Sequence, residues 1–414
     1  MMKMSGRTRP DGLPGELDPD IWRVCGPDEN PANLPLACLV SDQQAIPPGH
    51  QLYLTRDPDT HAPGALLRLP PELTHLAPGD IIGTSSDGRR VSVLWKSTAT
   101  HNSLLLTEQC DNYCLMCSQP PKDRDDSWLF DRARQIVSLL PPSATSLGLT
   151  GGEPTLHADA LISLLEHCRD TAPRVQLHLL SNGRRFADVG FARRYAQIDN
   201  ADIMVGIPLY APEPGLHDYI VQARGAFDET VHGILNLAAL SQRVEIRIVI
   251  QRHTVPVLQD LAVFIASNLP FVDQVALMGL EMTGLARPNS AEVWIDPADY
   301  QPELTSAVRT LASAHITTRI YNHQLCVLNE QLWPYAVRSI SDWKNDYLDL
   351  CQACSVREIC GGIFTTSGSR LSRDLHAITT HSQQAAAPDS TLAAASVMPG
   401  RPVALAAEHT SAVG

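Results

Sequence analysis

The sequence predicts an α/β protein built on a partial (β/α)6 TIM-like barrel, with a small β-rich N-terminal domain and a cysteine-bearing C-terminal extension. Two patterns predict this arrangement. Up to about residue 100 the apolar segments are short and are broken by Pro and Gly, as in small β domains. From about residue 103 short apolar segments alternate with longer ones whose apolar residues recur every three or four positions, as in repeated βα units.

Length and composition limit the number of domains, the kind of partner and the cellular location that are expected. The chain has 414 residues, 44% of them hydrophobic, so it can bury one large domain with additions or two to three domains. The formal net charge of −13 disfavours a nucleic-acid partner, because phosphate binding needs a cationic face. The N-terminus lacks an apolar stretch, and the chain has no apolar run of the length that spans a membrane. We therefore expect a cytoplasmic protein whose clustered cysteines bind metal or do redox work.

The first hundred residues divide into an arm and a small domain. Residues 1–33 are polar and rich in Pro, Gly and Asp, which predicts a flexible arm. Residues 34–100 contain several short apolar segments. A DG turn at 87–88 precedes the alternating segment VSVLW at 91–95, which predicts a hairpin.

The segment 101–295 carries the predicted barrel. Its six expected strands are 103–109, 146–151, 175–182, 201–210, 243–251 and 272–281. The five expected helices are 128–140, 158–170, 190–198, 227–240 and 256–268. Right-handed crossovers place such strands in a parallel sheet that curls toward a barrel, and six units leave the barrel open. A flat doubly wound sheet is the alternative that pattern alone leaves open.

The stretch CDNYCLMC places Cys110, Cys114 and Cys117 in the loop after the first expected strand. In a βα barrel this loop opens at the catalytic face. Three thiolates can hold a 4Fe–4S cube by three of its irons and leave the fourth iron open to a ligand. Three cysteines with one further ligand can instead close a structural zinc site. The spacing itself leaves both kinds of site open.

The second expected strand ends in LTGGEPTLH. Gly151 and Gly152 allow backbone to approach a ligand closely, and the Glu153 carboxylate can bind an ammonium group. Pro154 is also typical of an ordinary entry into a helix, so a plain βα turn is the alternative.

These motifs resemble the radical S-adenosylmethionine (SAM) superfamily. The resemblance rests on CDNYCLMC, on GGEP and on the SNG that ends the third expected strand. It implies that Cys110, Cys114 and Cys117 bind a 4Fe–4S cluster whose open iron is chelated by SAM. It also implies that residues 151–154 receive the methionyl amino group of SAM.

Further cofactor contacts follow from the same resemblance. Ser181 and Asn182 match a site near the ribose or methionine of SAM. Met116 stands where the family usually has an aromatic residue that stacks on adenine, and its thioether can still pack on a ring. The alternation in RVEIRIVI places Arg247 on the lumen side of the fifth strand, where it could pair with the carboxylate of SAM. A structural interaction between Glu245 and Arg247 is the alternative.

A second set of cysteines lies in the predicted extension, residues 296–375, and comprises Cys326, Cys351, Cys354 and Cys360. CQACSVREICGG resembles the auxiliary-cluster extension of peptide-modifying radical SAM enzymes, which implies a second, auxiliary 4Fe–4S cluster closed by four thiolates. Phe364 stands where the fuller form of this extension has another cysteine. A four-cysteine zinc site is the alternative.

Other parts of the chain carry less information. Cys25 and Cys38 could form a disulfide or bind a metal, and two cysteines so far apart in sequence are weak evidence for either. Residues 376–414 are mostly Ala, Ser, Thr, His and Pro, which predicts a disordered tail.

At finer grain, residues 103–364 resemble the HxsC family of radical SAM maturases from His-Xaa-Ser systems. This resemblance implies a small ribosomal peptide substrate with His-Xaa-Ser repeats, a partner radical SAM maturase and an external electron donor. It also implies reductive cleavage of SAM to a 5′-deoxyadenosyl radical that abstracts hydrogen from the peptide. It assigns no catalytic side chain. A radical SAM enzyme acting on RNA and a non-catalytic zinc scaffold are the open alternatives.

Overall fold

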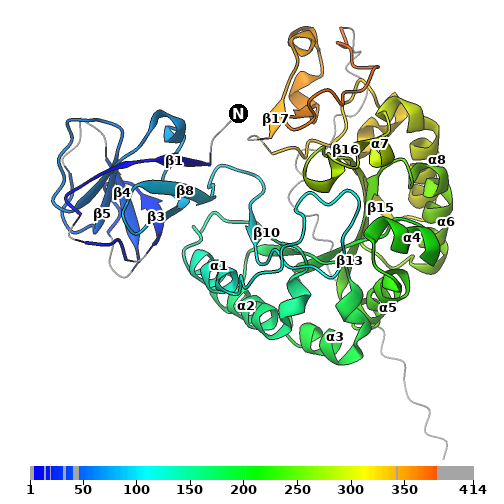
Figure 1. Ribbon diagram of the computed structural model, residues 1–414, viewed down its shortest axis with the longest axis horizontal. Coiled ribbons are helices and arrows are strands. Elements are labelled where there is room, and N and C mark those ends of the chain that lie inside the picture. The colour runs from blue at the N-terminus through cyan, green and yellow to red at the C-terminus, as the bar shows by residue number, and fades with distance from the viewer. Residues whose placement is uncertain are drawn as a thin grey trace, which may run out of the picture.

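The computed structural model describes residues 4–13, 15–18, 20–30, 34–40, 46–200, 202–341 and 344–379. A β-rich N-terminal part lies beside a larger α/β part, and a short C-terminal extension follows (Figure 1).

The α/β part is built on one parallel sheet of eight strands. In sheet order these are β16 (Ala336–Val337), β15 (Thr317–Tyr321), β14 (Gln274–Gly279), β13 (Arg243–Ile250), β12 (Ile203–Pro208), β11 (Gln176–Leu180), β10 (Ser146–Thr150) and β9 (Ser103–Leu105). The strand order follows the chain order without a reversal, as in a barrel, whereas a doubly wound sheet reverses at a switch point. The predicted partial barrel is therefore confirmed, and the doubly wound alternative is wrong.

Two strands of the sheet were not predicted. β15 and β16 lie in the segment that the sequence assigned to the extension, so the sheet exceeds the six predicted strands. Along β15, buried residues alternate with exposed or half-buried ones, and β16 is only two residues long. Their strand conformation depends on pairing with β14 and with each other, which a local pattern does not reveal.

Helices cover the outer side of the curved sheet (Figure 1). They are α1 (Trp128–Ser138), α2 (Ala158–Thr171), α3 (Val189–Ala196), α4 (Pro214–Val221), α5 (Ala226–Ala239), α6 (Leu258–Asn268), α7 (Ser290–Val293) and α8 (Gln301–Ser313). Buried residues of the strands and of α1, α2, α3, α5, α6 and α8 form one large apolar cluster, which is the core of this part. The buried apolar residues of α4 and α7, Ile220, Val221 and Val293, belong to a separate cluster. All five predicted helices are present, and α4, α7 and α8 are additional.

The N-terminal part is a mixed sheet of eight strands. In sheet order these are β1 (Ser5–Arg7), β8 (Arg90–Trp95), β7 (Ile81–Thr84), β3 (Ile21–Cys25), β4 (Leu36–Val40), β5 (Leu52–Thr55), β6 (Ala65–Arg68) and β2 (Arg9–Asp11). Strands β3 to β6 pair in parallel, and the other pairs are antiparallel. The predicted hairpin is confirmed as β7 and β8, with Gly88 at a φ of +66° between them.

The prediction of a flexible arm over residues 1–33 is wrong for three segments, because β1, β2 and β3 belong to the sheet. β3 is a central strand in which Ile21, Trp22, Val24 and Cys25 are buried. The edge strands β1 and β2 are held by pairing with β8 and β6. Backbone pairing and a buried apolar strand override the polar, Pro-rich composition of the segment.

The N-terminal sheet packs against the α/β part. Ile21, Ile81 and Trp95 belong to the same apolar cluster as the strand and helix residues of the barrel. A buried ion pair lies at this end of the sheet, where Lys96 Nζ is 2.7 Å from Asp80 Oδ2.

The C-terminal extension contains the antiparallel pair β17 (Asn345–Asp346) and β18 (Ile363–Phe364), with two single turns of 3-10 helix between them. The predicted disordered tail, 376–414, lies outside the described residues from residue 380 onward. Among the helices of the described ranges, none is both long enough and apolar enough to cross a membrane.

Candidate active site

The loop that carries the first three cysteines is held from two sides. The Leu115 backbone N–H donates to the Ile220 carbonyl at the end of α4 (3.0 Å), and the Leu285 N–H donates to the Cys117 carbonyl (2.8 Å). Gly284 has a φ of +52°, and a Cβ there would lie 2.3 Å from the Cys117 carbonyl oxygen. The loop after β9 is therefore positioned by segments that come more than a hundred residues later.

Burial keeps the three thiols neutral in the absence of a cation. It raises the pKa of Cys110 to about 12, and the Glu153 carboxylate adds to the rise. The pKa of Cys114 is raised by burial and then by the charges of Cys117 and Cys110. Burial also raises the pKa of Cys117. The three side chains thus act on one another, and a metal centre would convert them to thiolates because coordinated thiols lose their protons.

The spacing of the three sulfur atoms can be compared with the spacing of ligands around a single zinc ion. Donors around a single zinc ion lie about 3.8 Å apart, because Zn–S bonds are about 2.3 Å long. Within the described part of the chain, Cys110, Cys114 and Cys117 are not a group whose sulfur atoms all lie within 4.8 Å of one another.

Glu153 connects the ends of β10 and β11. Its Oε1 accepts hydrogen bonds from the Thr155 N–H (3.0 Å), the Thr155 hydroxyl (2.6 Å) and the Ser181 hydroxyl (2.8 Å). Its Oε2 accepts the Asn182 N–H at 2.5 Å. Burial raises the pKa of Glu153, while these four donors favour the ionised form. The carboxylate predicted to meet an ammonium group is therefore engaged in holding the two loops together.

Two glycines bring the GGEP segment against the cysteine loop. A Cβ at Gly151 would lie 2.5 Å from the Thr107 carbonyl oxygen, and one at Gly152 would lie 2.1 Å from the Gln109 carbonyl oxygen. The Glu153 N–H donates to the same Gln109 carbonyl at 2.7 Å. The glycines thus serve a close approach of backbone to backbone, which places residues 151–154 directly beside Cys110.

Ser181 and Asn182 are both buried at the end of β11. The Ser181 hydroxyl accepts the Gly183 N–H at 3.1 Å in addition to its bond to Glu153. Asn182 Nδ2 donates to Asp111 Oδ1 at 2.6 Å, which connects this segment to the cysteine loop. The structure therefore brings the GGEP and SNG segments together with the cysteine loop, and their contacts with a cofactor stay a prediction.

Met116 lies in a small apolar cluster apart from the main core. The cluster includes Tyr210, Val221, Met282 and Val293, and Met116 itself is buried. Flexible thioethers and an aromatic ring can pack on a planar base. Met116 packs against these neighbours, and its contact with the adenine of SAM stays a prediction.

Arg247 is paired with neighbours on the inner side of the sheet. Its Nη1 donates to Glu245 Oε1 (2.5 Å), and its Nη2 donates to Met278 Sδ (3.2 Å). Gln274 Nε2 donates to Glu245 Oε2 at 2.5 Å, and His178 Nε2 lies 3.4 Å from Glu245 Oε1. Burial opposes the charged form, but Arg247 and His178 hold the pKa of Glu245 down at about 2. The structure contains the Glu245–Arg247 interaction, and the role of Arg247 toward SAM stays a prediction.

The four cysteines of the extension also come together. Cys326 follows β15, whereas Cys351, Cys354 and Cys360 lie between β17 and β18. Burial raises the pKa of Cys326, and the charges of Cys360, Cys351 and Cys354 add to the rise. Among the described residues no three of these sulfur atoms lie within 4.8 Å of one another. Whether this set holds a second 4Fe–4S cluster or a zinc ion stays a prediction.

Comparison with protein families settles the class of the central segment. Residues 104–257 match the model of the Radical SAM superfamily. This segment is a radical SAM domain. It begins in β9 and ends just before α6, and it contains Cys110, Cys114 and Cys117 together with the GGEP and SNG segments. A radical SAM domain implies a 4Fe–4S cluster and SAM as cofactors, and it supports assignment as a radical SAM enzyme.

Several solved structures resemble the chain at low identity. Streptococcus suis SuiB is 16% identical with a TM-score of 0.42, over 57% of this chain and 52% of SuiB. The anSMEcpe protein with bound AdoMet and a Cp18Cys peptide is 15% identical (TM-score 0.42), over 52% of this chain and 62% of that one. A radical SAM methyltransferase from Sphaerobacter thermophilus is 16% identical (TM-score 0.41), over 59% of this chain and 73% of the methyltransferase.

These matches do not carry an activity to this chain. The chain spans about half of SuiB, the first of them, at 52%. A search of the curated proteins found no match. What lies outside the radical SAM domain, including the four cysteines of the extension, therefore has to be interpreted from its own residues.

Sequence reasoning missed two polar residues that build the radical SAM site. Arg184 Nη1 donates to the Asp111 carbonyl oxygen (2.9 Å) and to Asn112 Oδ1 (2.8 Å), so it holds the cysteine loop from the β11 side. The buried Asp126 accepts the Thr107 hydroxyl at 2.9 Å, at the start of the loop. Arg184 directly follows the SNG segment, which was the available signal for it, whereas no motif marks Asp126.

Proposed function

We propose that this chain is a radical SAM enzyme that modifies a small ribosomal peptide, as an HxsC-type maturase of a His-Xaa-Ser system. The observation that carries the proposal is the presence of two separate cysteine sets. One set lies in the radical SAM domain, and the other is assembled from the segment after β15 and the extension, both outside that domain.

In this proposal Cys110, Cys114 and Cys117 hold the 4Fe–4S cluster. When bound, the cluster and SAM supply a reductive cleavage that yields a 5′-deoxyadenosyl radical able to take hydrogen from a substrate. The GGEP segment lies against Cys110, and in this proposal it receives the amino end of SAM. The buried cluster around Met116 would exclude water from the adenine side.

The residues around these cysteines keep the site in one arrangement. Glu153 joins the β10 and β11 loops, and Asn182 joins the β11 loop to Asp111. Arg184 holds the cysteine loop through the Asp111 carbonyl and also pairs with Glu229 on α5 at 2.6 Å. A constellation fixed by such contacts orients a bound cofactor without reorganisation, which is the chain's main contribution to a cofactor-driven reaction.

Cys326, Cys351, Cys354 and Cys360 would hold the auxiliary 4Fe–4S cluster. The mutual influence of their charges, which shows that the four side chains lie near one another, supports this. With four thiolates the cluster has no open iron, so its role would be electron transfer or structural support. The peptide with His-Xaa-Ser repeats, the partner radical SAM maturase and the external electron donor rest on sequence resemblance.

The experiment is anaerobic reconstitution of the chain with iron and sulfide, followed by metal analysis and an assay for 5′-deoxyadenosine. We expect iron for two clusters and formation of 5′-deoxyadenosine. Cys114→Ala should abolish this product, whereas Cys354→Ala should lower the iron content by about one cluster's worth. Cys168→Ala, which alters a buried helix residue outside both sets, is the matched control.

The peptide is tested on the same sample with a His-Xaa-Ser repeat peptide and a scrambled peptide of equal composition. A mass change in the repeat peptide alone supports the substrate. Formation of 5′-deoxyadenosine without change in either peptide would reject the substrate class while keeping the chemistry. Product formation by Cys114→Ala would falsify the radical SAM assignment of this site.

A further inference from the structure

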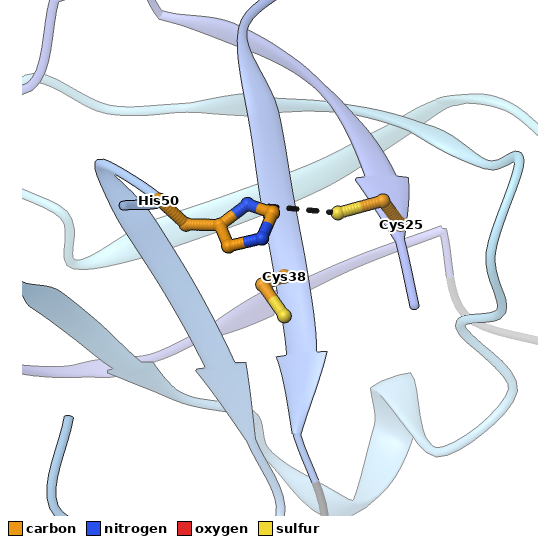
Figure 2. Close-up of side chains that lie close together, drawn as sticks. All are labelled: Cys25, Cys38 and His50. Carbon is orange, nitrogen blue, oxygen red and sulfur yellow. Dashed lines mark hydrogen bonds between the residues drawn. The ribbon is translucent and has the colours of Figure 1, made fainter. Parts of the chain in front are cut away.

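The N-terminal sheet brings Cys25, Cys38 and His50 together, far from both cysteine sets described above. Cys25 ends β3, Cys38 is its direct partner on the parallel neighbour β4, and His50 precedes β5 (Figure 2). Two neighbouring strands and the segment that leads into the third thus each contribute one side chain.

The distances between these side chains are those of ligands to one metal ion. The Cys25 Sγ, the Cys38 Sγ and a ring nitrogen of His50 all lie within 4.8 Å of one another. The Cys25 Sγ lies 3.9 Å from His50 Nδ1, along the dashed line in Figure 2. A tetrahedral zinc ion with bonds of about 2.3 Å to sulfur and about 2.0 Å to nitrogen separates its donors by about 3.5–3.8 Å. Small side-chain rotations would therefore place all three donors around one ion.

The residues around Cys25, Cys38 and His50 suit a buried, structural metal site. Cys25 and Cys38 are fully buried and His50 is 6% exposed. Both cysteines pack with Leu36, Val40, Tyr53 and Leu66 in an apolar cluster on one face of the sheet. The opposite face of the same strands packs in a separate cluster. An apolar sheath that excludes water is typical of structural metal centres.

The approach of His50 is maintained by its neighbours. The Tyr53 hydroxyl donates to the Pro47 carbonyl at 2.7 Å, which anchors the segment before β5. The rings of His50 and Tyr53 meet edge to face with their centroids 5.8 Å apart. The imidazole is therefore held toward the two cysteines and away from solvent.

We propose that Cys25, Cys38 and His50 bind one zinc ion that ties β3, β4 and the start of β5 together. Thiolate and imidazole ligands select zinc over magnesium and calcium, which prefer oxygen donors. Two thiolates balance the charge of the ion, so the complex is neutral in its apolar surroundings. These side chains supply three of the four donors of a tetrahedral zinc ion, and one water molecule would supply the fourth.

A disulfide between Cys25 and Cys38 is the competing chemistry. Both cysteines are free thiols in the structure. A disulfide would make no use of the imidazole that lies against the Cys25 sulfur, whereas a metal ion uses all three side chains. The presence of His50 therefore favours the metal.

The test is the zinc and iron content of the full-length chain, purified under anaerobic conditions without added zinc. We expect one zinc per wild-type chain, loss of this zinc in Cys38→Ser, and an unchanged iron content. Cys168→Ser, which alters another fully enclosed cysteine, should keep the zinc. Zinc that survives Cys38→Ser but disappears in Cys114→Ala would overturn the proposal, because the ion would then belong to the radical SAM site.

A second readout uses the wild-type chain, so it does not depend on how well a variant folds. The chain is treated with a maleimide with and without prior chelation, and the labelled cysteines are identified by mass spectrometry. Chelation should expose Cys25 and Cys38 to labelling if zinc covers them. Equal labelling with and without chelator, or a Cys25–Cys38 disulfide in the native chain, would refute the site. Neither readout depends on radical activity, so the proposed function and this site can fail separately.

Discussion

The Glu153 carboxylate accepts the Ser181 hydroxyl at 2.8 Å and thereby ties the end of β10 to the end of β11. This bond is one of four that converge on the same buried carboxylate. The GGEP motif therefore acts as a junction between neighbouring βα loops, in addition to any contact with a cofactor.

Glu153→Gln should destabilise the chain by about 2 kcal/mol, because an amide NH2 would face donors where an oxygen now accepts hydrogen bonds. Weaker SAM binding should accompany the loss, since the β10 and β11 loops would separate. Denaturant unfolding and equilibrium dialysis measure the two effects. Ser181→Ala removes only one of the four donors and should cost about 1 kcal/mol. Equal costs for the two variants would contradict the junction.

Gly152→Ala should lower the iron content of the reconstituted chain. Its Cβ would lie 2.1 Å from the Gln109 carbonyl oxygen and 3.0 Å from the Cys110 Cβ, so the cysteine loop would have to move. Gly15→Ala is the matched control, because nothing lies within 4 Å of the Cβ that it adds. Iron analysis after reconstitution checks the prediction, and full iron occupancy in Gly152→Ala would show that the close approach is not needed.

The buried Glu245 should make stability depend on pH in the acid range. Its pKa of about 2 lies below the ordinary value of 4.5, so the unfolded chain binds the proton first. Its contribution, at most about 3 kcal/mol, is present above about pH 4.5 and is lost as the pH falls toward 2. Denaturant unfolding between about pH 5.5 and 3.5 should show a steeper loss in the wild type than in Glu245→Gln. Parallel curves would mean that Arg247 does not stabilise this carboxylate.

Lys96→Met should destabilise the N-terminal sheet by about 3–5 kcal/mol, because it leaves the buried Asp80 carboxylate without its counter-charge. Lys96 Nζ lies 2.7 Å from Asp80 Oδ2, and the Ser97 N–H donates to Asp80 Oδ1 at 2.8 Å. The double variant Asp80→Asn with Lys96→Met should recover part of the loss. Thermal unfolding of the single and double variants measures this coupling, and additive losses would argue against the pair.

Arg194→Ala removes an ion pair on the surface and serves as a comparison for the buried pair of Lys96 and Asp80. Arg194 pairs with Asp159, but the two side chains are 51% and 89% exposed. Solvent screens such pairs, so little change in stability is expected.

The local pattern of apolar and turn residues was sufficient to predict much of the fold. The six predicted strands and five predicted helices are present because apolar periodicity and turn residues are local properties of the chain. β15 and β16 escaped prediction because both are short and depend on long-range pairing, of β15 with β14 and of β16 with β15. β1 and β2 escaped for the same reason, since they are short edge strands in a Pro- and Gly-rich segment.

The candidate site also combines features that the local sequence predicts with features that only the tertiary structure shows. The spacing of Cys110, Cys114 and Cys117 is written in eight consecutive residues, so the sequence by itself determined which chemistry to look for. The contact between Gly152 and Gln109 joins residues 43 positions apart in the chain, and only the tertiary structure decided it. Parallel pairing of β9 with β10 brings such segments together, and no local pattern encodes that distance.

The sequence alone thus determined the elements of the barrel, the radical SAM motifs and the two cysteine sets, because each rests on residues close together in the chain. Tertiary structure decided that Glu153 is a junction, that Arg247 pairs with Glu245, and that His50 meets Cys25 and Cys38. The last of these follows from the register of β3 with β4 and from the pairing of β4 with β5, which His50 precedes. Side chains from separate strands meet only when sheet pairing fixes their register, and that pairing is a property of the whole fold.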